Sequence, residues 1–214
     1  MEITMNTGLN TKVDAINRVM AAIGSIGINS PEEIDWNIDA SDADKLIDAM
    51  SQAIQTNQGK GWWFNREEFH RLTPDTTNGY VTVPNNTIAC LIKRDNMDNQ
   101  PITLRGTTLF DAKSLGYDMR NAANKDGTIH AILVMNLPFE YLPATAKLAI
   151  TDAARFWVVN DKEGDKLKMD ALQRAADASY TSLLSEDSGQ KRRNMFDNSG
   201  IKWAVLRAGG YNNN

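Results

Sequence analysis

The feature that most constrains the fold is a change of hydrophobic period near residue 60. Up to Gly59 the apolar residues recur at helical spacing, whereas polar and apolar positions alternate over residues 62–73 as in a strand. Gly59 and Gly61 permit a sharp change of direction between the two patterns, because glycine adopts backbone conformations closed to other residues. Three aromatic residues follow at once and are expected to join a helical part to a β part: Trp62, Trp63 and Phe64.

The residues before this hinge predict a helical hairpin over 11–58. Thr11 and Asp14 resemble a capping box at the start of the first helix, and Gly24 ends that helix. The second helix is predicted to begin between residues 39 and 41, with an apolar face formed by Ala43, Leu46, Ile47, Met50, Ala53 and Ile54. Alternating apolar residues in the connection predict a short extended piece, at Ile34, Trp36 and Ile38.

Residues 61–142 predict a small antiparallel sheet. Short β-favouring runs alternate with turn-forming residues such as Pro, Asn, Asp and Gly, and these runs cover 62–73, 80–83, 88–93, 103–109 and 128–135. The fold class is therefore α+β, a bundle of about four main helices with a small antiparallel β subdomain inserted between the second and third.

Two further helices are predicted after the sheet, over residues 144–160 and 165–185. In the first of them, polar residues recur every four positions in a narrow stripe, formed by Lys147, Thr151 and Arg155 with Asp152 beside it. Nearly every other position is apolar, which predicts burial on most sides, either by the chain's own domain or by a partner.

The chain divides into four predicted parts. Residues 1–60 are the first helical hairpin, 61–142 the β subdomain, 143–185 the second hairpin and 186–214 a C-terminal extension that contacts partners. The extension carries a basic run at 191–193 and apolar pieces with no obvious place in the bundle. No apolar run approaches the ~20 residues of a membrane span, so no membrane association is expected.

Charge is distributed unevenly along the chain. Residues 1–59 carry nine acids and three bases, residues 60–185 carry fifteen of each, and residues 186–214 carry three acids and five bases. A protein that grips nucleic acid over a wide surface needs a broad basic face, and this pattern lacks one.

Common catalytic and cofactor motifs are absent from the sequence, including phosphate-binding and dinucleotide-binding glycine loops, G-x-S-x-G and H-E-x-x-H. His70 and His130 lie on separate predicted strands and are expected to be structural or exposed rather than metal ligands. Cys90 lies in an apolar run and is expected to be a packed thiol. We therefore predict no cofactor, no metal and no catalytic residue.

One enzymatic alternative stays open, a carbohydrate or cell-wall hydrolase that uses Glu67 or Asp75 near the tryptophans. Adjacent strand positions point to opposite faces, so Glu67 and Glu68 are not expected to act on one bond together. The basic run at 191–193 is open to two interpretations, a solvated linker or a contact with phosphate or an acidic partner.

Several stretches, taken in order, resemble one family, tail tubular protein A, the adaptor or gatekeeper ring protein of short-tailed bacteriophages. One of them is G-W-W-F-N-R-E-E at 61–68, similar to the family pattern R-G-W-x-F-N-x-E, and the others lie at 15–24, 41–55, 72–75 and 137–156. The sequence departs from the family at 24–27, where a Gly-Glu-Pro turn is replaced, and the region from Ser185 onward does not follow the pattern.

The resemblance implies a virion structural protein of the phage tail, assembled in the host cytoplasm and without catalytic activity. Such proteins form a homo-oligomeric ring, typically of twelve copies, between the portal protein and a nozzle similar to tail tubular protein B. DNA passes through the shared channel without sequence-specific binding. Candidate contacts with neighbouring subunits or the portal are Trp62, Trp63, Phe64, Phe156, Trp157, Arg192, Arg193, Phe196 and Trp203.

Overall fold

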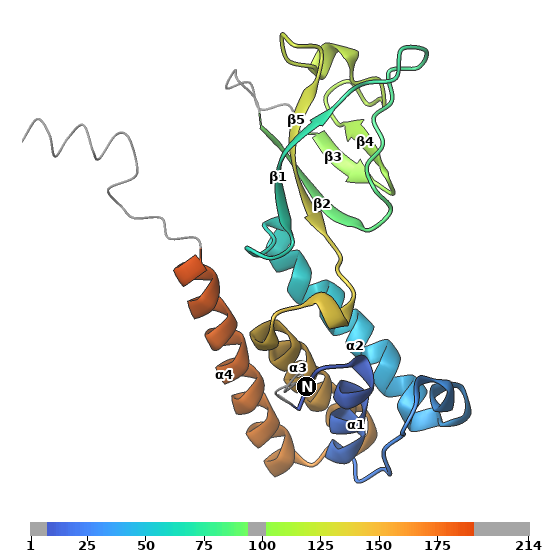
Figure 1. The fold of residues 1–214 in the computed structure, drawn as a ribbon, viewed down its shortest axis with the longest axis vertical. Helices are drawn as coiled ribbons and strands as arrows, with labels where there is room; N and C mark the ends of the chain where they lie inside the picture. The colour runs from blue at the N-terminus through green and yellow to red at the C-terminus, as the bar shows by residue number, and fades with distance from the viewer. Residues whose placement is uncertain (1–7, 94–101, 191–214) are drawn as a thin grey trace, which may run out of the picture.

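The computed structural model describes residues 8–93 and 102–190. Within them a helical bundle occupies one end of the molecule and a β subdomain the other (Figure 1). The helices are α1 (Lys12–Ala22), α2 (Ile38–Thr56), α3 (Ala144–Lys162) and α4 (Lys166–Gln190). The strands are β1 (Arg66–Leu72), β2 (Thr87–Lys93), β3 (Ile102–Arg105), β4 (Thr108–Asp111) and β5 (Ile129–Met135). The predicted α+β class, with the sheet inserted between α2 and α3, is confirmed.

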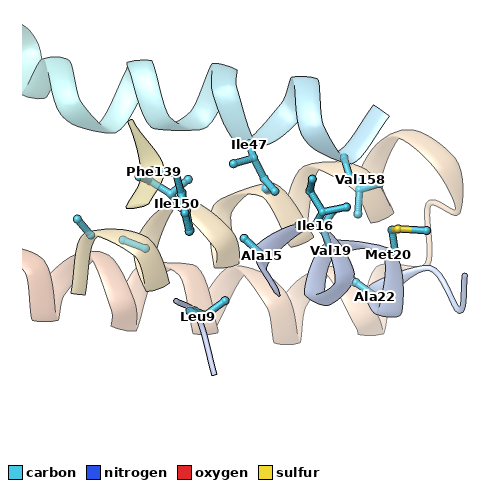
Figure 2. Packing of buried hydrophobic residues seen from close by; sticks show 14 of the residues in the cluster. Leu9, Ala15, Ile16, Val19, Met20, Ala22, Ile47, Phe139, Ile150 and Val158 are labelled. Atoms are coloured by element: carbon cyan, nitrogen blue, oxygen red, sulfur yellow. The ribbon is translucent and has the colours of Figure 1, made fainter. Parts of the chain in front are cut away.

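Helix α3 is the centre of the bundle, because α1, α2 and α4 all pack against it. The core between these helices is largely aliphatic, and Figure 2 shows side chains of it that include Ile16, Val19, Ile47, Ile150 and Val158. The bundle therefore has a hydrophobic core of its own and does not depend on the β subdomain for burial of its helix faces.

The predicted capping box at the start of α1 is confirmed. The Asp14 amide donates to Thr11 Oγ1 at 3.2 Å, and the Thr11 amide donates to Asp14 Oδ2 at 2.9 Å. The Thr11 amide is the largest cause that lowers the pKa of Asp14, and the amide of Asn10 adds to it. The ionised carboxylate therefore holds the first turn of the helix.

We expect Thr11→Ala to lower the free energy of unfolding by about 1 kcal/mol, as at other N-caps.

Asp14→Ala should show a pH dependence. A carboxyl whose pKa is lowered in the folded state stabilises that state above its unfolded pKa, and the contribution is lost as the pH falls through the folded pKa. Urea denaturation should thus separate Asp14→Ala from wild type at pH 7 and bring the two together near pH 2, whereas the exposed control Asp170→Ala should match wild type at both.

The connection between α1 and α2 differs from the predicted extended piece. Residues Pro31–Trp36 form a 3-10 helix, η1, and Ile38 is the first residue of α2. Pro31 occupies the first helical turn, where its fixed φ favours a helix, and Asn37 caps α2 by accepting from the Ala40 amide at 3.2 Å. An alternation of three apolar residues is too short to distinguish a strand from such a turn.

The sheet is antiparallel as predicted, with β5 central in the order β1-β5-β2 and a separate β3-β4 hairpin. Three predicted runs were wrong in detail. The run 62–73 forms a strand only from Arg66, where β1 begins, because residues 63–65 form a turn. The run 80–83 makes only an isolated bridge, between Thr82 and Thr108, and the run 103–109 is divided into β3 and β4 by Gly106 at φ +60°. A glycine with positive φ turns the chain where a continuous β pattern gives no sign of it.

The polar stripe of α3 lies inside the bundle. Lys147 Nζ donates to the Asn10 carbonyl at 3.1 Å, Thr151 Oγ1 donates to the Lys147 carbonyl at 2.7 Å, and all three of Lys147, Thr151 and Asp152 are buried. Burial of α3 on most sides is thus provided by its own domain, where Lys147 and Asp152 also have partners outside the stripe, Asn10 and Arg18. Helix α4 runs five residues beyond the predicted end at 185, as far as Gln190.

Candidate interaction site

Trp62 packs inside the helical bundle, at the start of the segment that leads from α2 to the β subdomain. Its side chain is fully buried, and its indole Nε1 donates to the Ile54 carbonyl at the end of α2 at 2.6 Å. The ring meets Tyr180 of α4 edge-on, with ring centroids 5.8 Å apart. In this conformation Trp62 packs within its own chain and leaves no surface for a neighbouring subunit.

The side-chain amides of Asn65 and Gln55 are buried on either side of the same junction. The sequence patterns did not identify these two residues as a pair. Asn65 Oδ1 accepts from the Trp62 amide at 2.8 Å, while Asn65 Nδ2 donates to the carbonyls of Gln55 and Met135 at 3.0 and 2.9 Å. The Gln55 side chain donates to the Leu137 carbonyl at 3.0 Å and accepts from the Leu137 amide at 2.8 Å. These bonds tie the end of α2 to both segments that lead into and out of the β subdomain.

The backbone conformation of the hinge restricts which residues can occupy it. Asn57, Gln58 and Gly59 all have positive φ, and Gly61 follows at φ +65°. A Cβ atom at Gly61 would lie 2.8 Å from Val134 Cγ1, so the chain passes β5 at a distance that only glycine permits. The predicted hinge is therefore present, and it is a fixed turn.

Trp63 and Phe64 lie half-buried at the surface of this junction, with their rings edge-on at 5.0 Å between centroids. The Trp63 amide donates to Asp187 Oδ1 at 3.0 Å, which fastens the last turn of α4 to the hinge. The same end of the bundle holds the start of α3, because Thr145 Oγ1 donates to Glu186 at 2.5 Å. We call this end, with Trp63 and Phe64, the hinge end.

Phe156 and Trp157 lie toward the opposite end of α3. Their rings are edge-on at 5.4 Å between centroids, and Trp157 is 44% exposed. Lys162, at the end of α3, forms ion pairs of 2.5 and 2.9 Å with Asp39 and Asp42 in the first turns of α2. The remaining predicted contacts, Arg192, Arg193, Phe196 and Trp203, lie outside the described residues.

The carboxylates considered for a hydrolase are not brought together. Glu67 Oε2 lies 2.7 Å from His70 Nε2 across a bulge in β1, and Glu68 Oε1 accepts from Arg66 Nε at 3.1 Å. Asp75 accepts from the amides of Asn78 and Thr77 in its own turn, and these bonds lower the pKa of its carboxyl. A general acid needs a raised pKa, so Asp75 is tuned the wrong way for that role.

The two histidines and the cysteine have surroundings that indicate structural roles. His130 lies 2.8 Å from Asp126 and does not share a partner with His70. Burial raises the pKa of the Cys90 thiol to about 11, which keeps it protonated and unreactive near neutral pH, as predicted for a packed thiol. Among residues 8–93 and 102–190 no cluster of three His, Cys, Asp or Glu side chains is placed to hold a metal ion. No described helix is both long and apolar enough to cross a bilayer.

Large apolar side chains lie exposed on rigid helices and turns, which is typical of a subunit that packs against other proteins. Comparison with known proteins agrees with this class. A family model described as tail tubular protein matches residues 13–197, so the chain belongs to the tail tubular protein family of phage tail structural proteins. A search of curated proteins gave no significant match.

Proposed function

We propose that this protein is the adaptor subunit of a short-tailed phage, which forms a ring between the portal and the tail nozzle and acts without catalysis. The observation that carries the proposal is the family match over residues 13–197. Twelve copies would surround a channel through which DNA moves during packaging, retention and ejection. The portal would lie above the ring and the nozzle below it.

The accessible aromatic residues support a role in assembly. Trp63 and Phe64 at the hinge end, and Phe156 and Trp157 on α3, keep apolar surface at the outside of an already filled core. Aromatic side chains are enriched in protein interfaces because each buries a large area at a low cost in conformational entropy. We assign these four residues to contacts with neighbouring subunits or the portal, while the buried Trp62 directly precedes two of them and anchors the chain in the bundle there.

The acidic N-terminal region supports passage of DNA without retention, if it faces the channel. Part of its charge is neutralised, since Lys12 pairs with Asp44 and Asp48, and Lys162 pairs with Asp39 and Asp42. The excess acidity of residues 1–59 nevertheless remains, and a negative wall repels the phosphate backbone. Finding this region on the outer surface of an assembled ring would contradict its proposed place in the channel wall.

Mass photometry of the chain with and without its portal ring tests the function. We expect a complex that gains one chain per portal subunit. Trp157→Glu places a charge in the proposed contact and should lower ring occupancy at least tenfold, because an unpaired charge is costly to bury. Leu115→Glu is the matched control, since Leu115 is exposed in the β subdomain, and it should assemble like wild type.

Circular dichroism should show that both variants keep the wild-type helix content, so that loss of occupancy reports assembly and not unfolding. A wild-type chain that stays monomeric when the portal ring is present would contradict the proposed function. Equal occupancy of the Trp157→Glu and Leu115→Glu variants would contradict the assigned contact.

A further inference from the structure

The connection between α1 and α2 presents the most exposed apolar surface of the bundle. Trp36 is 89% exposed, and Ile26 and Ile38 on either side of it are 88% and 79% exposed. The acids Glu32 and Asp35 are exposed on the same 3-10 helix, and no base occurs between residues 19 and 44. We call residues 26–38 the acidic platform.

The acidic platform is held in place by side chains of the bundle. Asn17 Nδ2 donates to the Ile28 carbonyl at 2.8 Å, and Asn17 Oδ1 accepts from the Ile28 amide at 2.7 Å. The Ser25 hydroxyl donates to Asp39, and the Asn29 amide donates to Glu33 Oε1 at 3.2 Å. Because the turn is already ordered, a partner that covers Trp36 pays little entropy for fixing it.

The C-terminal segment of the sequence has the complementary chemistry. Residues 191–214 carry five bases and one acid, with Lys191, Arg192 and Arg193 in succession and Phe196 close behind. The platform carries three acids and no base. A basic run followed by an aromatic residue matches an acidic turn that exposes a tryptophan, through ion pairs and cation–π contact.

Within one chain the basic run cannot reach the platform. Lys162, the last residue of α3, pairs with Asp39, so α4, which begins at Lys166, starts at the platform end of the bundle. The bond between Asp187 and Trp63 places the end of α4 at the hinge end (Figure 1). The 25 residues of α4 separate these ends by ~37 Å. Residues 191–193 extend at most ~10 Å beyond Gln190.

We propose that the C-terminal segment of one copy docks on the acidic platform of a second copy of this chain, with Lys191, Arg192 and Arg193 against Glu32 and Asp35 and Phe196 against Trp36. The contact joins the hinge end of one bundle to the platform end of the next. Contacts between two different surfaces close into rings when the rotation permits. The inference rests on the proposed function, because the ring supplies the second copy.

A fluorescein-labelled peptide of residues 191–214, added to the full-length protein and followed by anisotropy, tests the contact. We expect binding that weakens as salt rises. Glu32→Lys/Asp35→Lys should lower the affinity at least tenfold, and Trp36→Ala should do the same through loss of the aromatic contact. The matched controls are Asp177→Lys, exposed about half-way along α4, and Leu115→Ala, exposed in the β subdomain; both lie away from the platform and should bind the peptide like wild type.

A charge exchange makes the test specific. A peptide with Arg192→Glu/Arg193→Glu should lose binding to wild type and regain it with the Glu32→Lys/Asp35→Lys protein. Failure of the wild-type peptide to bind, or equal binding by the platform and control variants, overturns the proposal. If portal-bound rings form in mass photometry while the peptide does not bind, only this contact fails and the proposed function stands.

Discussion

Trp62→Ala is expected to lower the free energy of unfolding by about 4 kcal/mol, the range seen when a buried tryptophan is truncated to alanine. Trp62 is the largest fully buried side chain, and the variant loses the aromatic contact with Tyr180 and leaves the Ile54 carbonyl without its indole donor. Since domains of this size are stable by only ~5–15 kcal/mol, urea denaturation should show a large shift of the midpoint.

Two further variants separate burial from the loss of any tryptophan. Trp36→Ala removes a side chain that is 89% exposed and should change the free energy of unfolding by less than about 0.5 kcal/mol. Trp62→Phe keeps a ring in the junction and should cost less than Trp62→Ala. If Trp62→Ala and Trp36→Ala were equally stable, burial of the Trp62 side chain would not be what stabilises this end of the helical bundle.

Asn65→Ala is expected to lower the free energy of unfolding by about 3 kcal/mol, although only a small side chain is removed. The buried Asn65 amide serves the Trp62 amide and the carbonyls of Gln55 and Met135, and its loss leaves these three backbone groups short of a partner. Each buried group left unsatisfied costs about 1–3 kcal/mol, and partial hydration of the gap reduces the sum.

The pH dependence of Asn65→Asp tests whether hydrogen bonding is the cause. At pH 7 a carboxylate would face two carbonyl oxygens, so this variant should be destabilised at least as much as Asn65→Ala. Such a group has a raised pKa in the folded state, and stability should recover as the pH falls and the acid becomes a donor. Asn160→Ala removes an exposed amide and should match wild type at both pH values. A flat pH profile for Asn65→Asp would point to lost packing instead.

Local patterns were sufficient to predict the order of the elements and the class of the fold. Helical spacing, the Thr11 capping box and turn residues between β runs each depend on neighbours within a few positions, and the structure confirms all three. The ordered set of five stretches between residues 15 and 156 led to the family, and the family match confirms that resemblance.

Other features depend on contacts between distant residues, and these the sequence did not predict. The polar stripe of α3 gave no sign of which side it faced, and it lies inside because Asn10 and Arg18 supply its partners. Ile34, Trp36 and Ile38 offered the pattern of a strand, yet Pro31 and Asn37 favour a turn and a new helix there.

The sequence by itself determined the order of the four main helices, the position of the sheet between them and the hinge at 59–61, since these properties arise from side chains close together along the backbone. Only the tertiary structure decided which aromatic residues are enclosed and which are left accessible. Trp36 lies between Asp35 and Asn37, and Trp62 lies between Gly61 and Trp63, and neither local sequence says which other element will cover the ring. Trp62 is buried against Tyr180 and Ile54, which belong to other elements. Trp36 lies on a turn that no described part of the chain covers.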